Sequence, residues 1–149
     1  MEIYYGSQLG NAQNVSQEIQ HLISEHYKEK IELKMLNDFS FENIPKIIIF
    51  VCSTTGNGEF PENAVKFHKK IKQRSNPKDM FQGVTYAVLG LGDTNYSYFC
   101  ETAKKIQKRC KELGGTPVFP MQYIDAMDDF DEKIETFVNS IITSIESIR

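Results

Sequence analysis

Residues 46–61 read KIIIFVCSTTGNGEFP, an apolar run followed by a loop rich in hydroxyl groups and glycine. The run 46–52 is almost wholly apolar and β-branched, which is typical of a central parallel strand covered on both faces. Shorter strands are predicted at residues 2–6, 31–36, 85–89 and 116–119. We place the last of these at a sheet edge, because Pro117 has no N–H group to donate.

Four other stretches carry apolar residues at helical spacing. The first begins after Asn11, the expected N-cap, and the second is opened by Pro61. The third runs from Phe99 to a stop at residues 114–115, and the fourth begins at Phe130. The order β-α-β-β-α-β-α-β-α predicts an α/β fold with a parallel sheet and helices on both faces. Between the second and third strands we expect a loop, 37–45, with a short helix or none.

The composition indicates a globular chain, and we expect residues 1–149 to form one domain. Hydrophobic residues make up 40% of the chain, and its net charge is −3. No apolar run reaches the roughly 18 residues of a membrane span, so no membrane association is expected. A nucleic-acid partner is not expected either, because the chain is not basic. Three cysteines without a C-x-x-C pair argue against disulfides or a zinc site and favour a cytoplasmic location.

The charge is unevenly distributed along the chain. Residues 1–113 carry a net charge of +2, whereas residues 114–149 carry −5. Two interpretations stay open: acidic groups suit the N-terminus of a helix, or they dock a basic partner. The acidic residues concerned are Asp125, Asp128, Asp129, Asp131, Glu132 and Glu135.

The loop 6–12, GSQLGNA, joins the first strand to the first helix. Its hydroxyl, amide and backbone N–H groups at a helix N-terminus form an anion site. The loop lacks the G-K-[ST] ending of a nucleoside triphosphatase and the three-glycine dinucleotide fingerprint. A neutral cradle of dipoles suits a single phosphate monoester. The alternative is an ordinary polar turn.

Two further loops, 53–61 and 90–99, follow neighbouring strands and contain pairs of glycines. Glycine permits positive φ and the close approach of a flat ligand. Tyr96 or Tyr98 offers a ring to stack on that ligand, whereas Phe99 fits the core. Flexible loops and core aromatics are the alternative. Ligands in parallel α/β sheets sit beyond the carboxyl ends of the strands, so the three loops predict one pocket for a phosphate and an aromatic ring.

Three segments carry a resemblance to the flavodoxins, and more closely to the FMN domains of diflavin reductases. IYYGSQLGNAQNVSQEI resembles the opening YGSQTGNAE, and VCSTTGNGEFPENAVKFHKKI resembles STTGDGEPPDNA. The third, YAVLGLGDTNYSYFCETAKKIQKRCKELGGTPVF, resembles GLGDSxYxxFCxxxKxxDxxLxELG. The domains of methionine synthase reductase, sulfite reductase and NADPH–cytochrome P450 reductase are the most similar members considered. The resemblance implies a flavodoxin-like three-layer sandwich whose five-stranded parallel sheet has the order 2-1-3-4-5.

The resemblance also implies FMN as cofactor and assigns residues to it. Leu9 departs from the usual Thr and removes a hydroxyl group from the phosphate cradle. Thr55 stands where some relatives place a Tyr, which leaves one face of the ring more open, and the loop around Asp125 is shorter than in relatives. The residues assigned to FMN are Ser7, Gln8, Leu9, Gly10, Asn11, Ala12, Ser53, Thr54, Thr55, Gly56, Asn57, Gly58, Leu89, Gly90, Gly92, Asp93, Asn95, Tyr96, Phe99 and Asp125.

The function that the resemblance implies is single-electron transfer through FMN. The donor would be an FAD- and NADPH-dependent reductase domain or protein, the acceptor another protein, and the chain a monomer. The peptide 56–57 would turn to accept a hydrogen bond from the reduced flavin. Three alternatives stay open: a module of a larger NADPH-dependent diflavin reductase, an FMN-dependent quinone or nitro reductase, and a binding module that has lost flavin. The intact glycines and Tyr96 argue against the last.

Overall fold

A computed structural model describes residues 1–55 and 57–148 of the chain. Gly56 and Arg149 lie outside the described residues, so the predicted turn of the peptide 56–57 stays a prediction. The strands are β1 (Glu2–Gly6), β2 (Glu32–Met35), β3 (Ile47–Ser53), β4 (Thr85–Gly92), β5 (Thr116–Pro117) and β6 (Gln122–Asp125). The α-helices are α1 (Asn11–Tyr27), α2 (Val65–Ile71), α3 (Glu101–Glu112) and α4 (Phe130–Ile148), and short 3₁₀ helices are η1 (Leu36–Asp38) and η2 (Glu62–Ala64).

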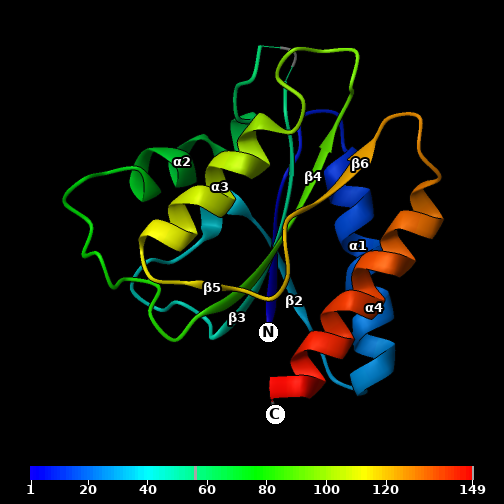
Figure 1. Cartoon of the computed structure of the whole chain (residues 1–149), viewed down its shortest axis with the longest axis horizontal. Coiled ribbons are helices and arrows are strands. Elements are labelled where there is room, and N and C mark those ends of the chain that lie inside the picture. Colours follow the sequence, from blue (N-terminus) through cyan, green and yellow to red (C-terminus); the bar gives the residue numbers. More distant parts are fainter. Residues whose placement is uncertain (56, 149) are drawn as a thin grey trace.

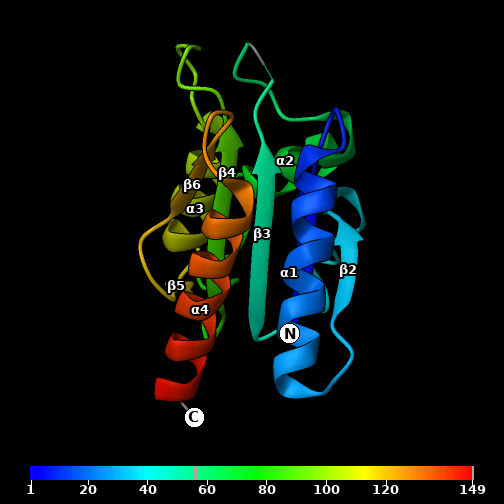
Figure 2. The same ribbon diagram turned by 90° about the vertical axis from the view of Figure 1, so that its right-hand side faces the viewer.

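All strand pairs are parallel, and the sheet has the order β2-β1-β3-β4-β5, as predicted. One layer of helices, α2 and α3, covers one face of the sheet, and α1 and α4 cover the other (Figure 1). The view turned by 90° shows α1 and α4 side by side in front of the strands (Figure 2). Between β2 and β3 the described chain forms the single turn η1, which agrees with the expected loop.

The core consists of two apolar layers, one on each face of the sheet. Alternate residues of β3 supply both layers, because successive side chains of a strand point to opposite faces. Ile49 and Val51 pack with α1 and α4, whereas Ile48, Phe50 and Cys52 pack with α2 and α3. The near-continuous apolar sequence of this strand is therefore explained by burial on both sides.

The fifth strand differs from the prediction. We expected one strand at 116–119, but β5 ends at Pro117, and a second segment, β6, pairs with β4 further along. Val118 still donates its N–H group to the Tyr86 carbonyl oxygen over 2.8 Å. The pairing then lapses around Pro120, which has no N–H group to donate. Strand β6 therefore occupies a segment that the sequence analysis read as loop.

The start of α1 also differs from the prediction. Asn11 is the first helical residue rather than the N-cap, and it follows Gly10, whose φ is 89°. Ser7, which precedes the helix by four residues, supplies the capping group. Its hydroxyl oxygen accepts hydrogen bonds from Gly10 N at 2.9 Å and Ala12 N at 3.2 Å. The glycine is required here, since its left-handed conformation costs little without a β-carbon.

None of the described helices is both long enough and apolar enough to pass through a bilayer.

Candidate functional site

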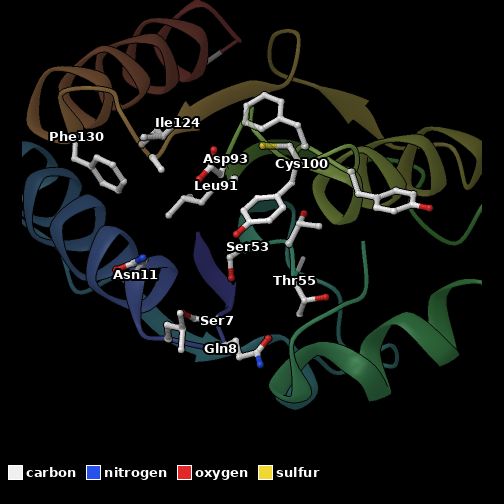
Figure 3. A pocket seen from close by; sticks show the side chains of 17 residues that line it. Ser7, Gln8, Asn11, Ser53, Thr55, Leu91, Asp93, Cys100, Ile124 and Phe130 are labelled. Carbon is white, nitrogen blue, oxygen red and sulfur yellow. The ribbon is translucent and has the colours of Figure 1, made fainter. Parts of the chain in front are cut away.

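The three predicted loops meet around one cavity at the carboxyl ends of β1, β3 and β4 (Figure 3). Its volume is about 480 Å³, within the range of sites for small organic cofactors. In Figure 3, Ser7, Gln8 and Asn11 lie on one side of the cavity, and Ile124 and Phe130 lie on another. The lining combines hydroxyl and amide groups with aromatic and aliphatic side chains.

Eleven residues that the sequence assigned to the cofactor line this cavity. They are Ser7, Gln8, Leu9, Asn11, Ser53, Thr54, Thr55, Gly92, Asp93, Tyr96 and Phe99. Eight others do not appear in its lining, namely Gly10, Ala12, Asn57, Gly58, Leu89, Gly90, Asn95 and Asp125. Gly56 lies outside the described residues.

The first loop is held from two directions. Ser7 donates its N–H group to the Asn63 side-chain oxygen over 2.9 Å, and Ser53 donates its hydroxyl proton to the Gly6 carbonyl oxygen over 3.2 Å. The N-terminus of α1 carries no acidic residue in its first turn. Its partial positive charge is therefore uncompensated by the helix itself, which favours an anion at this end of the cavity. The side chain of Leu9 is 88% exposed and contributes no polar group.

The second loop closes on itself before it reaches η2. Thr55 donates its N–H group to the Glu59 carbonyl oxygen over 3.1 Å, and its hydroxyl oxygen accepts the Glu59 N–H over 3.1 Å. Gly58 donates to the Thr55 carbonyl oxygen over 2.9 Å. Thr55 therefore uses its hydroxyl group to shape the loop, and the same residue lines the cavity.

The third loop is ordered by two aspartates. Asp93 accepts the Asn95 N–H on its side chain over 2.9 Å and the Tyr96 N–H on its carbonyl oxygen over 3.0 Å. The Asp125 carboxylate accepts the Thr94 hydroxyl over 2.8 Å and the Thr94 N–H over 3.2 Å. These bonds from Thr94 hold the pKa of the Asp125 carboxyl below its ordinary value. Asp125 thus supports the loop from outside the cavity.

Six lining residues were not assigned to the site from the sequence. Leu91 lies between two assigned glycines, and Tyr98 was considered as a stacking ring but not assigned. Phe130 was read as the first apolar residue of the last helix. The sequence pattern therefore pointed to the segments that contain these three residues. Nothing in the pattern pointed to Cys100, Ile124 or Ala126, which the fold brings to the cavity.

The three cysteine thiols are buried and are poor nucleophiles. Burial raises the pKa of the Cys52 and Cys100 thiols to about 12, and it raises that of Cys110 as well. A thiol with such a pKa stays protonated at neutral pH and is a poor nucleophile. Cys100 therefore contributes shape rather than covalent chemistry to the cavity.

Comparisons with known proteins agree with this geometry. The family model described as Flavodoxin matches residues 3–138. The chain is 32% identical over 145 residues to the sulfite reductase [NADPH] flavoprotein alpha-component of Bacillus subtilis (strain 168), covering 96% of this chain and 23% of that protein. It is 33% identical over 156 residues to methionine synthase reductase of Bos taurus, covering 97% and 21%. The chain thus spans less than a quarter of the length of these two relatives.

Solved structures give the same result for the whole fold. Oxidised flavodoxin 2 from Bacillus cereus superimposes with a TM-score of 0.78 at 26% identity, and the match covers 98% of this chain and 97% of that one. The family model covers far more than half of the chain. The chain therefore belongs to the flavodoxin family, whose cofactor is FMN.

Proposed function

We propose that the chain binds one FMN in the cavity at the strand ends and passes electrons one at a time between a reductase and a protein acceptor. The observation that carries the proposal is that three loops, far apart in sequence, join a polar anion cradle to an aromatic rim around one cavity. A bound FMN would supply the one-electron chemistry. The chain supplies binding, orientation and access.

The residues of the first loop fit a phosphate group. Ser7, Gln8 and Asn11 bring hydroxyl and amide groups to the cavity, and the Ser7 hydroxyl oxygen is itself fixed by the N–H groups of Gly10 and Ala12 at the start of α1. A dianionic phosphate is favoured there by the helix dipole. With Leu9 turned to solvent, the cradle has one hydroxyl group fewer than its relatives.

The other two loops fit a flat ring. Thr54 and Thr55 line one side of the cavity, and Tyr96 and Tyr98, which are 57% and 51% exposed, stand at its rim. An aromatic ring stacked on such a side chain gains about 0.5–1.5 kcal/mol beyond its buried area. We assign Tyr96 to the ring face. We assign supporting positions around the ring to Ser53, Asn57, Gly58, Leu89, Gly90, Gly92, Asp93, Asn95, Phe99 and Asp125.

The relatives support a reductase as electron donor, because two of them are a flavoprotein component of an NADPH-dependent enzyme and a reductase. We propose that the acceptor is a protein, that the chain acts as a monomer in the cytoplasm, and that residues 1–149 form one FMN-binding unit. The acidic residues Asp128, Asp129, Asp131 and Glu132 suit the docking of a basic partner, because Phe130, which lies among them, and the nearby Ala126 line the cavity. A partner held there reaches the cavity mouth.

Calorimetric titration of the flavin-free chain tests this function. We expect one equivalent of FMN to bind tightly and FAD to bind much more weakly, because the phosphate cradle is closed by α1 and has no dinucleotide fingerprint. Equal affinity for the two flavins would overturn the assignment. The FMN-loaded chain should accept electrons from an added NADPH-dependent reductase but should not oxidise NADPH alone. Unaided NADPH oxidation would point instead to a quinone or nitro reductase.

A further inference from the structure

Thr102 has a polar side chain that is buried in the protein interior. It lies in the first turn of α3 and is completely buried, as is the shorter hydroxyl side chain of Ser16 in α1. Its hydroxyl oxygen lies 3.0 Å from the Ser53 carbonyl oxygen and 2.9 Å from the Thr54 hydroxyl oxygen. Its N–H group donates to the same Thr54 hydroxyl oxygen over 3.2 Å. A buried hydroxyl group is costly unless it is hydrogen-bonded, and here each part has a partner.

The order of the protons follows from these contacts. The Ser53 carbonyl oxygen only accepts, so the single proton of the Thr102 hydroxyl points toward it. The Thr54 hydroxyl must then donate its own proton to Thr102, while it accepts the Thr102 N–H. The result is a closed set of three hydrogen bonds, which we call the Thr54–Thr102 interlock. The proton of the Thr54 hydroxyl is committed inside the protein and is not offered to a ligand.

The interlock joins the second loop to the start of α3, the helix that follows the third loop. The start of α3 is itself pressed against β4, because a β-carbon at Gly90 would stand 2.8 Å from the Ala103 β-carbon. A β-carbon at Gly92 would stand 3.0 Å from the Cys100 nitrogen. The start of α3 is therefore packed tightly against β4. Because Thr102 in α3 is hydrogen-bonded to Ser53 at the end of β3, the start of the second loop is held in a fixed position relative to α3.

We propose that Thr102 is a positioning residue for FMN: through the interlock it fixes the start of the second loop, at Ser53 and Thr54, at a set distance from the third loop. The proposal rests on the proposed function, since it assigns the ring to the space between these loops. Thr102 itself does not line the cavity. It acts through Ser53 and Thr54, both of which line the cavity.

The test uses a pair of variants at one position. Thr102→Val keeps the shape of the side chain and removes the hydroxyl group, whereas Thr102→Ser keeps the hydroxyl group. In the FMN-loaded chain, we expect Thr102→Val to raise the FMN dissociation rate at least about tenfold, because two hydrogen bonds of the interlock are lost. We also expect the two one-electron midpoint potentials to change their separation. Thr102→Ser should stay close to the wild-type chain in both measurements.

Ser16→Ala is the matched control for the loss of a buried hydroxyl group. Ser16 is fully buried and donates to the Ala12 carbonyl oxygen over 2.6 Å within α1. This variant reports the general cost to stability without touching the two loops. If Thr102→Val and Ser16→Ala lower stability alike and both leave the flavin dissociation rate and the potentials unchanged, Thr102 is only a satisfied core residue and the proposal is wrong.

A second measurement needs no flavin. In the flavin-free chain, Thr102→Val should speed amide hydrogen exchange at Thr55, Gly58 and Glu59, whose N–H groups hold the second loop. Thr102→Ser should not. If the wild-type chain does not bind FMN but this exchange pattern is observed, the proposed function is wrong. The interlock would then only stabilise the conformation of the second loop. Unchanged exchange in Thr102→Val would remove the interlock itself.

Thr54→Val tests the same interlock if Thr102→Val does not fold. It breaks the same interlock from the less buried partner. We expect it to reproduce the faster exchange at Gly58 and Glu59 and the faster FMN dissociation. Where both variants fold, the double variant should add little to either single change, because partners in one network are not additive. Fully additive effects would contradict the interlock.

Discussion

A β-carbon at Gly58 would stand 2.9 Å from the Cγ atom of Tyr98, so the second loop passes directly against the side chain of the third. Gly58 also has a φ of 77°, which side chains rarely adopt. The position therefore demands glycine twice, once for its conformation and once for the contact with Tyr98.

Gly58→Ala should weaken both folding and flavin binding. The left-handed conformation alone costs a residue with a β-carbon about 1–2 kcal/mol. The displaced Tyr98 ring adds to this cost and opens the cavity rim. Gly83→Ala is the control, because Gly83 has a φ of 82° with no atom within 4 Å of a β-carbon. Urea unfolding and FMN titration of both variants measure the difference. Equal losses of stability, with equal FMN affinity, would mean that the contact with Tyr98 has no role.

Ser7→Ala should lower the affinity for FMN through its phosphate group. Loss of the hydroxyl oxygen leaves the N–H groups of Gly10 and Ala12 without their capping partner. Removal of such a cap costs about 0.5–2 kcal/mol of helix stability. Titration with FMN and with riboflavin, which lacks the phosphate, separates the two contributions. We expect a several-fold loss for FMN and little change for riboflavin. A parallel loss for both flavins would place the phosphate elsewhere.

His68 should make the chain less stable in mild acid. Its ring stacks on Phe60, with centroids 4.1 Å apart. Burial first, and then the charges of Lys72 and Lys105, lower the pKa of His68 from 6.5 to about 4. Because the folded-state pKa lies below the unfolded one, the contribution of His68 to stability is complete above pH 6.5. It is lost as the pH falls from 6.5 toward 4, where the unfolded chain binds the proton first.

The variant His68→Phe isolates this contribution, because it keeps a flat ring on Phe60 and cannot bind a proton. Its free energy of unfolding should fall less between pH 7 and pH 5 than that of the wild-type chain. Urea denaturation at the two pH values provides the measurement. An identical fall in both proteins would show that His68 is freely protonated in the folded state.

Electron transfer from a separate reductase should slow as salt is added, if the acidic start of α4 docks that partner. Asp128 and Asp129 also have structural tasks, because they accept the N–H groups of Asp125 and Glu132. Asp131 has no such contact among the described residues and is the better residue to change. Asp131→Asn should lower the transfer rate at low salt and not at high salt. Glu29→Gln, which removes one charge beyond the far end of α1, should have no effect. A rate independent of salt would exclude this docking role.

The sequence predicted most of the sheet, because long apolar strands and glycine-rich loops carry strong local signals. The parallel order and the meeting of three loops at one end of the strands are confirmed. The N-cap at Asn11 was wrong because the helix begins one residue earlier: Asn14 N donates to the Gly10 carbonyl oxygen, and the Ser7 hydroxyl oxygen accepts the Ala12 N–H group. A local pattern of residue types does not distinguish these two ways of capping a helix.

Other features depend on contacts between distant residues and left no local trace. The helical pattern of α3 ran through Phe99, Ala103 and Ile106 and passed over Thr102, whose partner Thr54 lies 48 positions earlier. The contact between Gly58 and Tyr98 is equally remote in sequence. Pro120 indicated in the sequence that the fifth strand would be interrupted. The sequence did not show where the pairing ends, because Val118 still donates a hydrogen bond to β4.

The interrupted fifth strand also affects how the sheet meets other chains. A long, flat edge strand is a template for edge-to-edge aggregation. Here one edge begins with the two residues of β5, one of them Pro117, and breaks before β6. The other edge is β2, four residues long, with Glu32 and Lys34 among them. Short, charged and proline-bearing edges offer no continuous ladder to an added strand, so the sheet is protected from growth at both ends.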